Sequence, residues 1–423
     1  MKVGILTPRI LDRPTGIVVY TRELVGALGM VDPRCEIVLL SRSASDKLPD
    51  WFHGHQTIRL GPPAGGSRRN PMLPLQVLRT GRDLGLDIVH ATGNIALFTP
   101  IESCFKKVVT VHDVGPLAHP GDRSKKEALV HAAFIPPLRW TTDAVIADSV
   151  ATAADLTRFA GIPAGLIDVI PLGTNGQQPW AREPDESETF ASDLRPYFLA
   201  VGDVALHKNL NGVLEAFGVV LASRHDANLI VAGRLGFGGP ELVAQAEAKL
   251  KDSVSFAGYV SDDELDALYR DAVALVAPSF YEGFGLTVLE AMARGVPVIT
   301  SNVSSLPEVA GDAALLVDPA RPAEIAGAML KILEQPELAQ NLRVKGVERA
   351  RQFTWRHTAE QTIQVYERVL AGVPPDATEW RNEVAQPRSI ARTWLATLQR
   401  GMRTDGISWR RSRGREGRHG VYL

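Results

Sequence analysis

Short runs of apolar, mostly β-branched residues recur along the chain, and each is followed by a stretch in which apolar residues return at helical spacing. Strands that are apolar throughout and alternate with amphipathic helices are typical of parallel sheets covered on both faces. About a dozen strands are predicted, which is enough for two sheets. In chain order the runs are KVGILTP, EIVLLSR, DIVHATG, KVVTVHD, AVIADS, DVIPLG, YFLAVGD, NLIVAGR, VSFAGYV, VALVAPS, PVITSN and ALLVDP.

The alternation is interrupted once, at residues 173–196, which are rich in Gly, Pro, Ser and acidic residues. Such a composition is typical of a linker. The prediction is therefore a first Rossmann-like domain over residues 1–180 and a second over residues 181–371. Residues 354–370 are predicted to form a last amphipathic helix, and its return to the first domain is left open. A double proline follows it and ends regular structure before a basic tail, residues 372–423.

Length and composition agree with this division, because 423 residues exceed what one hydrophobic core usually serves. Apolar residues make up 45% and charged residues 22%, and no apolar run approaches the ~20 residues that span a bilayer. The first residues, MKVGILTPRI, are predicted to be a strand rather than a secretory signal, which favours a soluble, cytoplasmic protein. Cys35 and Cys104 are predicted to be buried and to take no part in a disulfide or metal site.

Ligands of open parallel sheets bind outside the carboxyl ends of the strands, so the strand-to-helix loops are expected to carry the chemistry. With two such domains, the cleft between them is the expected site. The stretch SFYEGFGLTVLEAMA places Glu282 and Glu290 on either side of a Gly-Phe-Gly turn that opens a helix. The unpaired amides of a helix N-terminus suit a diphosphate. Glu282 precedes the helix and Glu290 lies about one and a half turns inside it, so the two carboxylates have different tasks.

Carboxylates accept hydrogen bonds from paired hydroxyls, so a sugar near Glu282 and a ribose near Glu290 would complete a nucleotide-sugar site. Taken singly, each glutamate is better explained by a solvated surface position, and the nucleotide-sugar interpretation depends on the matching residues at other strand ends. Lys208 follows a strand that ends at Gly202 and is a candidate phosphate cation. Gly16 lies in the first strand-to-helix loop, another helix entry suited to phosphate. His112 and Asp113 follow a strand directly, as a hydrogen-bonded pair that orients a substrate or as a structural pair.

In this order the motifs resemble the glycosyltransferases of family 4, retaining enzymes of the GT-B fold. The family signature, two glutamates separated by seven residues and opening in a Glu-Gly-Phe-Gly turn, is matched by residues 282–290. The similarity continues through EAMARGVPVITSNVSSLPEVAGDAALLVDP and includes FAGYVSDDELDALYRDA. It covers roughly residues 1–370 and is most specific in the second half. The resemblance implies an α/β, GT-B protein whose two Rossmann-like domains face a cleft.

The resemblance also assigns roles by position. Lys208 would hold the donor diphosphate, Glu290 the ribose, and Glu282 the sugar, while His112 would face the transferred sugar. The catalytic residues it implies are His112, Lys208 and Glu282. The donor-binding residues it implies are Gly16, Gly202, His207, Lys208, Gly258, Tyr259, Glu282, Gly283, Phe284, Gly285, Leu286, Thr287 and Glu290.

One position departs from the family pattern, in which Arg often precedes the phosphate lysine. This chain has His207 there, and a mostly neutral imidazole replaces a permanent cation. Phosphate affinity is therefore expected to be weaker or pH-dependent. The acidic run Asp262, Asp263 and Glu264 follows Ser261 and is predicted to be a capping box rather than a metal site. No cofactor and no metal are expected, since the family transfers sugars without a metal.

Two basic stretches bear on the acceptor. Residues 68–82 interleave four arginines with apolar residues, and similar enzymes use this region at a membrane surface. In the tail, an apolar stripe at helical spacing lies among arginines, as in an interfacial helix. A stripe that packs on the body, followed by a disordered end, explains the tail equally well. Nucleic-acid binding is not expected, because the basic run is confined to the tail. From residue 387 onward the nine arginines are 388, 392, 400, 403, 410, 411, 413, 415 and 418.

The sequence thus predicts a retaining hexosyltransferase that uses a nucleotide-sugar, with GDP-mannose favoured over UDP-sugars. The acceptor is expected to be a hydroxyl of a glycan or lipid-linked molecule in polysaccharide or glycolipid synthesis. The enzyme is expected in the cytoplasm or peripherally on the inner face of the cytoplasmic membrane. Two rivals stay open: a catalytically idle nucleotide-sugar-binding or scaffold protein of the same fold, and a GT-B epimerase or phosphorylase.

Overall fold

The computed structural model describes residues 1–8, 15–43, 48–60, 72–94, 101–119, 121, 125–174, 196–224, 226–236 and 239–373. Most of the predicted linker, the arginines at 68 and 69, and the tail from residue 374 lie outside the described residues. Within them, no helix combines the length and apolar character needed to cross a bilayer.

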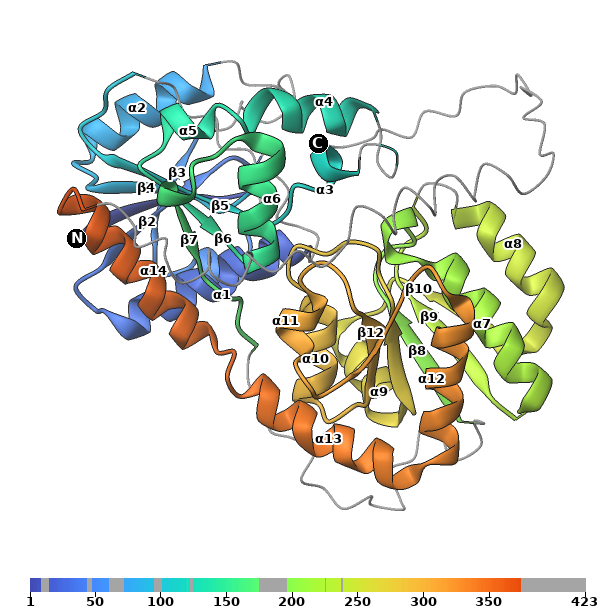
Figure 1. The fold of residues 1–423 in the computed structure, drawn as a ribbon. Coiled ribbons are helices and arrows are strands. Elements are labelled where there is room, and N and C mark those ends of the chain that lie inside the picture. Colours follow the sequence, from blue (N-terminus) through green and yellow to red (C-terminus); the bar gives the residue numbers. More distant parts are fainter. Residues whose placement is uncertain are drawn as a thin grey trace.

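The first half of the chain forms a seven-stranded parallel sheet in the order β3-β2-β1-β4-β5-β6-β7, with helices on both faces (Figure 1). Its strands are buried almost throughout, which explains their continuous apolar runs. The strands are β1 Lys2–Leu6, β2 Glu36–Ser41, β3 Gln56–Arg59, β4 Ile88–Ala91, β5 Lys106–Val111, β6 Ala144–Ala147 and β7 Ile167–Val169. The α-helices are α1 Gly16–Val31, α2 Leu73–Asp83, α3 Gly115–Ala118, α4 Lys125–Phe134, α5 Leu138–Thr141 and α6 Val150–Ala160, and the 3-10 helices are Asp50–Phe52 and Ala164–Leu166.

The second half forms a six-stranded parallel sheet in the order β10-β9-β8-β11-β12-β13. Its strands are β8 Tyr197–Val201, β9 Asn228–Ala232, β10 Val254–Gly258, β11 Ala274–Ala277, β12 Val298–Ser301 and β13 Leu315–Val317. Its α-helices are α7 Leu210–Ser223, α8 Gly239–Leu250, α9 Asp262–Asp271, α10 Leu286–Ala293, α11 Leu306–Ala310, α12 Pro322–Glu334 and α13 Pro336–Ala350, and the 3-10 helices are η3 Leu206–Lys208 and Lys251–Ser253.

Each of the twelve predicted strand segments contains a strand, so the α/β prediction of two parallel sheets is confirmed. The strand that the pattern missed is β3, whose sequence QTIR has one strongly apolar residue and lies at the sheet edge. Edge strands need less apolar surface because one side stays open to solvent. Cys35 is buried as predicted, but Cys104 is exposed in the loop before β5, so that prediction is wrong. Its neighbour Phe105, rather than Cys104, fills the core at this point.

The last helix, α14 Trp355–Leu370, returns to the first half and packs against α1 (Figure 1). The hydroxyl of Tyr366 lies 2.7 Å from Nδ1 of His90, whose Nε2 lies 2.8 Å from Thr110 Oγ1. The same Thr110 oxygen lies 2.8 Å from the hydroxyl of Tyr20 on α1. Burial lowers the pKa of His90 to about 3, so this buried chain of hydrogen bonds is uncharged.

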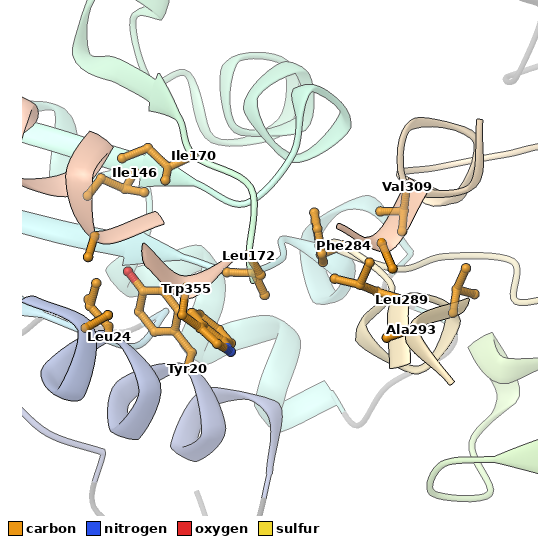
Figure 2. Packing of buried hydrophobic residues seen from close by; sticks show 14 of the residues in the cluster. Tyr20, Leu24, Ile146, Ile170, Leu172, Phe284, Leu289, Ala293, Val309 and Trp355 are labelled. Atoms are coloured by element: carbon orange, nitrogen blue, oxygen red, sulfur yellow. The ribbon is translucent and has the colours of Figure 1, made fainter. Parts of the chain in front are cut away.

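The point where α14 begins is a crossover between the two halves. Thr174 pairs with Thr354 in an isolated parallel bridge, beside the ring of Trp355. A side chain at Gly173 would place its Cβ 2.1 Å from the backbone nitrogen of Trp355, so only glycine fits there. Figure 2 shows the apolar side chains that continue from Tyr20, Leu172 and Trp355 toward Phe284 and Leu289 of the second half. The two sheets are therefore joined by the chain twice, at neighbouring positions.

Candidate active site

The position of Lys208 depends on a close approach between the residues that follow β8 and β9. A Cβ at Gly233 would lie 1.9 Å from the carbonyl oxygen of Gly202, so the two strand ends approach this closely only because Gly233 has no side chain. After β8 the chain forms η3, which ends at Asn209, a residue with a left-handed φ of 58°. The Asn209 amide donates to the carbonyls of Pro278 and Pro319, at 3.1 and 2.7 Å, and this fixes the turn that carries Lys208.

Glu282 is the partner of Lys208, with 2.6 Å between Nζ and Oε1. The hydroxyl of Ser279 donates to the same carboxylate oxygen at 2.7 Å. Burial alone raises the pKa of a carboxyl group, but Lys208 and the other neighbours outweigh it and hold the pKa of Glu282 below its usual value. Glu282 is therefore an ionised acceptor at neutral pH.

The loop after Glu282 is held by two serines that follow β12. Ser304 Oγ donates to the Glu282 carbonyl at 2.6 Å and accepts from its backbone N–H at 3.2 Å. Ser305 Oγ donates to the carbonyl of Phe284 at 2.7 Å. The Phe284 ring is buried and packs edge-to-face on Phe353. These contacts fix both the carboxylate and the helix entry that follows it.

Two helix N-termini from the two halves face each other at this loop. Gly285 caps α10 with a φ of 116°, which glycine adopts without strain. Leu286 and Thr287 form the first turn of α10, and a Cβ at Gly16, where α1 begins, would lie 3.7 Å from Leu286 Cδ1. Each terminus offers unpaired amides and about half a positive charge. The arrangement is suited to a diphosphate.

A pocket lies beside Lys208 and Glu282, at the carboxyl ends of β8, β9 and β11, and its lining residues all belong to the second half. The predicted residues Gly202, Lys208, Glu282 and Thr287 all line it. Its other lining residues are Ala200, Val201, Asp203, Val204, Leu210, Val213, Val231, Val276, Ala277 and Ser279.

His112 follows β5 in the first half, and its acid partner is Asp148, which follows the neighbouring strand β6. The distance from Nδ1 to Asp148 Oδ2 is 2.6 Å, and Nε2 lies 3.2 Å from the carbonyl of Thr92. The Thr92 carbonyl and an ionised Asp148 both accept hydrogen bonds, so this pair of partners favours a charged ring with a proton on each nitrogen. Burial opposes this charge, but Asp148 and Thr92 outweigh burial and raise the pKa of His112.

The predicted hydrogen-bonded pair of His112 and Asp113 is wrong. Consecutive residues of an extended segment point to opposite sides, so Asp113 turns away and accepts instead from the Gly115 N–H at 2.9 Å and the Asn94 amide at 3.4 Å. The backbone of His112 nevertheless lies at the predicted site. A Cβ at Gly283 would lie only 1.8 Å from the His112 carbonyl oxygen.

Four other predicted residues, Glu290, His207, Gly258 and Tyr259, do not line this pocket. Glu290 lies on α10 with Oε2 3.4 Å from the Tyr269 hydroxyl, and burial raises its pKa despite Arg294 nearby. His207 is buried, and its proximity is one of the causes that lower the pKa of Glu282. Gly258, with a φ of 68°, ends β10, and its carbonyl accepts from the Gly233 N–H at 2.7 Å. Tyr259 is 60% exposed and does not line the pocket.

The capping box predicted at Ser261 and Glu264 is confirmed, with both reciprocal hydrogen bonds present. In the part of the chain that the structure describes, no three His, Cys, Asp or Glu side chains are grouped as metal ligands would be.

Sequence reasoning missed several side chains of the site. Asp148 had a signal, since it directly follows an apolar run, as His112 does. Ser279 and Ser304 had none, because serine is ordinary in loops. Glu308 lies in the stretch that resembles the family, but its role had no local signal, because a first-turn helix glutamate is ordinary. Their importance comes from contacts between segments far apart in the sequence.

Known proteins resemble the chain in the same two parts. Residues 182–349 match the family model described as "Glycosyl transferases group 1", and residues 14–178 match "Glycosyltransferase Family 4". The O-antigen chain mannosyltransferase B of Escherichia coli is 32% identical over 388 residues, which cover 86% of this chain and 99% of that protein. The chain belongs to glycosyltransferase family 4.

This glycosyltransferase also resembles the MMP alpha-(1->4)-mannosyltransferase of Mycolicibacterium hassiacum, at 35% identity over 53% of this chain and 54% of that protein. Among solved structures, the sucrose-phosphate synthase from Thermosynechococcus elongatus superposes with a TM-score of 0.70 at 24% identity, covering 88% of this chain and 99% of that one. The likeness to the sucrose-phosphate synthase concerns the fold alone. The GT-B arrangement predicted from the motifs is confirmed.

Proposed function

We propose that this glycosyltransferase moves a mannosyl group from GDP-mannose to a hydroxyl of a glycan or lipid-linked acceptor in the synthesis of a cell-surface polysaccharide. The choice of mannose as the donor sugar rests on the similarity to an O-antigen chain mannosyltransferase over 99% of that protein. The Lys208–Glu282 pair beside two helix N-termini supports a nucleotide-sugar in general. It does not distinguish GDP from UDP, so the base rests on the similarity.

In this proposal Lys208 and the first-turn amides of α10 stabilise the charge that develops on the departing diphosphate. Such fixed donors are effective because they need no reorganisation during the reaction. The start of α1 at Gly16 lies close enough to Leu286 to contribute from the other domain. Glu290 binds the ribose hydroxyls from its place on α10, and Gly258 and Tyr259 contact the base.

Glu282 serves as a sugar-binding acceptor and not as a nucleophile. Its carboxylate already accepts from Lys208 and Ser279, and its lowered pKa reflects stabilised negative charge, which reduces nucleophilicity. A double displacement needs a free carboxylate on the far face of the sugar. We therefore propose transfer with retention by a same-face route, with the protonated His112 beside the sugar.

Contact with an anionic membrane surface is part of the proposal. On α2, Arg79 and Arg82 have exposed side chains that lie within ion-pair distance of Asp83. Leu75 and the N-cap residue Met72 are about half exposed, while Val77 packs inward. Each basic group near an anionic leaflet contributes about 1 kcal/mol to binding. Residues 68–71 of the first basic stretch and the tail from residue 374 lie outside the described residues.

The test of the donor is ligand-induced thermal stabilisation across GDP, UDP, ADP and TDP and their common sugar conjugates. A ligand at about a hundred times its dissociation constant adds ~2.7 kcal/mol to the free energy of unfolding. GDP and GDP-mannose are expected to raise the melting temperature selectively. Selective stabilisation by UDP compounds would overturn the choice of donor, and the absence of any response from folded protein would favour the idle scaffold.

A further inference from the structure

Helix α6 receives an unusual cap, because its first-turn amides are bound by a carboxylate from the other half of the chain. Ser149 caps the helix in the ordinary way, accepting from the Thr152 N–H at 3.0 Å. The N–H groups of Val150 and Ala151 donate instead to Oε2 and Oε1 of Glu308, each at 2.8 Å. Glu308 lies on α11 of the second domain, on the side that α6 faces in Figure 1.

The same end of α6 contacts the loop that carries Glu282. The hydroxyls of Ser149 and Thr152 both donate to the Gly283 carbonyl, at 2.6 and 3.0 Å. The Val114 N–H, on the segment that follows His112, donates to the Tyr281 hydroxyl at 3.3 Å. Residues 281–283 are therefore bound from both sides by the first domain.

Glu308 is itself fixed to the site loop. Arg349 on α13 donates to the backbone carbonyls of Glu308 and Val309, and this anchors α11 to the second domain. Four residues before Glu308, Ser304 forms its two hydrogen bonds with Glu282. On the other side, Asp148, the partner of His112, immediately precedes Ser149 at the α6 cap. The Glu308 contact thus links the segment that carries Asp148, the partner of His112, to the segment that carries Ser304, the partner of Glu282.

We propose that Glu308 is a positioning residue that holds the two domains together in the catalytic arrangement. By binding the α6 amides it keeps the Asp148–His112 pair opposite the Glu282 loop while the donor reacts. The predicted effect on the reaction rate rests on the proposed glycosyl transfer, whereas the predicted effect on the separation of the domains does not. Glu308 lies outside the apolar clusters of the two domains, so its replacement removes a polar contact and no core packing.

The experiment compares Glu308→Ala and Glu308→Gln with Glu337→Ala, a control that removes an exposed carboxylate from the first turn of α13. Domain separation is measured by spin-label distances between Cys104, which is exposed, and a cysteine introduced at Val344, which is 58% exposed. Cys35 is buried and stays unlabelled. The other readouts are kcat, donor KM and the GDP dissociation constant.

We expect Glu308→Ala to broaden the distances toward larger separations and to lower kcat by about tenfold or more, since misplacement of about 1 Å costs up to a hundredfold. GDP affinity should stay within about threefold, because Glu308 does not line the pocket. Glu308→Gln should fall between wild type and Glu308→Ala, since one carboxylate oxygen is replaced by an NH2 group that cannot accept from the second amide. Glu337→Ala should match wild type.

An unchanged distance distribution in Glu308→Ala overturns the inference, whether or not kcat falls. Should that variant fold poorly, Thr152→Val removes a neighbouring contact, the hydroxyl that reaches the Gly283 carbonyl, and must shift the distances in the same direction. If the wild-type enzyme transfers sugar from no donor, the proposed function fails, and the distance measurement still decides the role of Glu308.

Discussion

Replacing Gly283 with alanine adds one methyl group at a close contact between the two domains. The new Cβ would lie 1.8 Å from the His112 carbonyl oxygen and 3.0 Å from Asp113 Cβ. Since Cβ atoms are not found within 3.0 Å of other heavy atoms, the carbonyl must retreat by about 1.2 Å. Gly283 does not have a positive φ, so alanine causes no backbone strain of its own and the effect is steric.

A displacement of about 1 Å between reacting groups costs roughly a hundredfold in rate. We therefore expect Gly283→Ala to lower kcat by about that factor, while GDP affinity stays within about threefold because the pocket lies in the second domain. Initial rates over a donor series give kcat and KM, and calorimetry gives the dissociation constant. The matched control is Gly327→Ala on α12, where a Cβ meets nothing within 4 Å. Wild-type kcat in Gly283→Ala would refute the idea that the two domains meet this closely during catalysis.

Three further predictions concern the charges and the buried polar network. Lys208→Met should weaken GDP binding by roughly 10- to 100-fold, since a charged hydrogen bond contributes about 1.5–3 kcal/mol, and calorimetry showing equal affinity would remove its phosphate role. The pKa of His112 is raised on folding, so its charge stabilises the protein fully below its unfolded pKa of about 6.5 and this stabilisation is lost as the pH rises through the folded value. The melting temperature of His112→Gln should therefore fall furthest below wild type under acidic conditions, and a constant difference from pH 5 to 9 would contradict the assignment. Tyr366→Phe leaves Nδ1 of buried His90 without its partner and should cost about 1–3 kcal/mol in urea unfolding, whereas an unchanged midpoint would show that the contact contributes nothing.

Periodicity predicted the sheets well because parallel strands are buried on both faces. Their apolar runs can therefore be recognised without knowing which strands pair. It failed at β3, where an edge strand needs little apolar surface. Spacing located the Glu282 loop because its glycines and helix entry are local features. It paired His112 with the wrong carboxylate, since Asp113 is adjacent in sequence while Asp148 is adjacent in the sheet.

The contacts of Glu308 and of the two serines after β12 could not be predicted from the sequence, for the same reason. They join residues more than twenty or, for Glu308, more than one hundred and fifty positions apart. A single sequence records which residue types are present, but not which loops the topology brings together. Sheet order supplies that information, because strand ends that are neighbours in a sheet place their loops side by side.

The most direct test of the proposed function is transfer of labelled mannose from GDP-mannose to a lipid-linked or soluble glycan, followed by measurement of the anomeric configuration of the new linkage. We predict that label enters the glycan with the donor's α configuration, that UDP-glucose supplies no sugar, and that Lys208→Met reduces the transfer. A product with inverted configuration would contradict the same-face route. A folded protein that binds GDP-mannose and yet transfers no sugar to any acceptor would contradict the account as a whole.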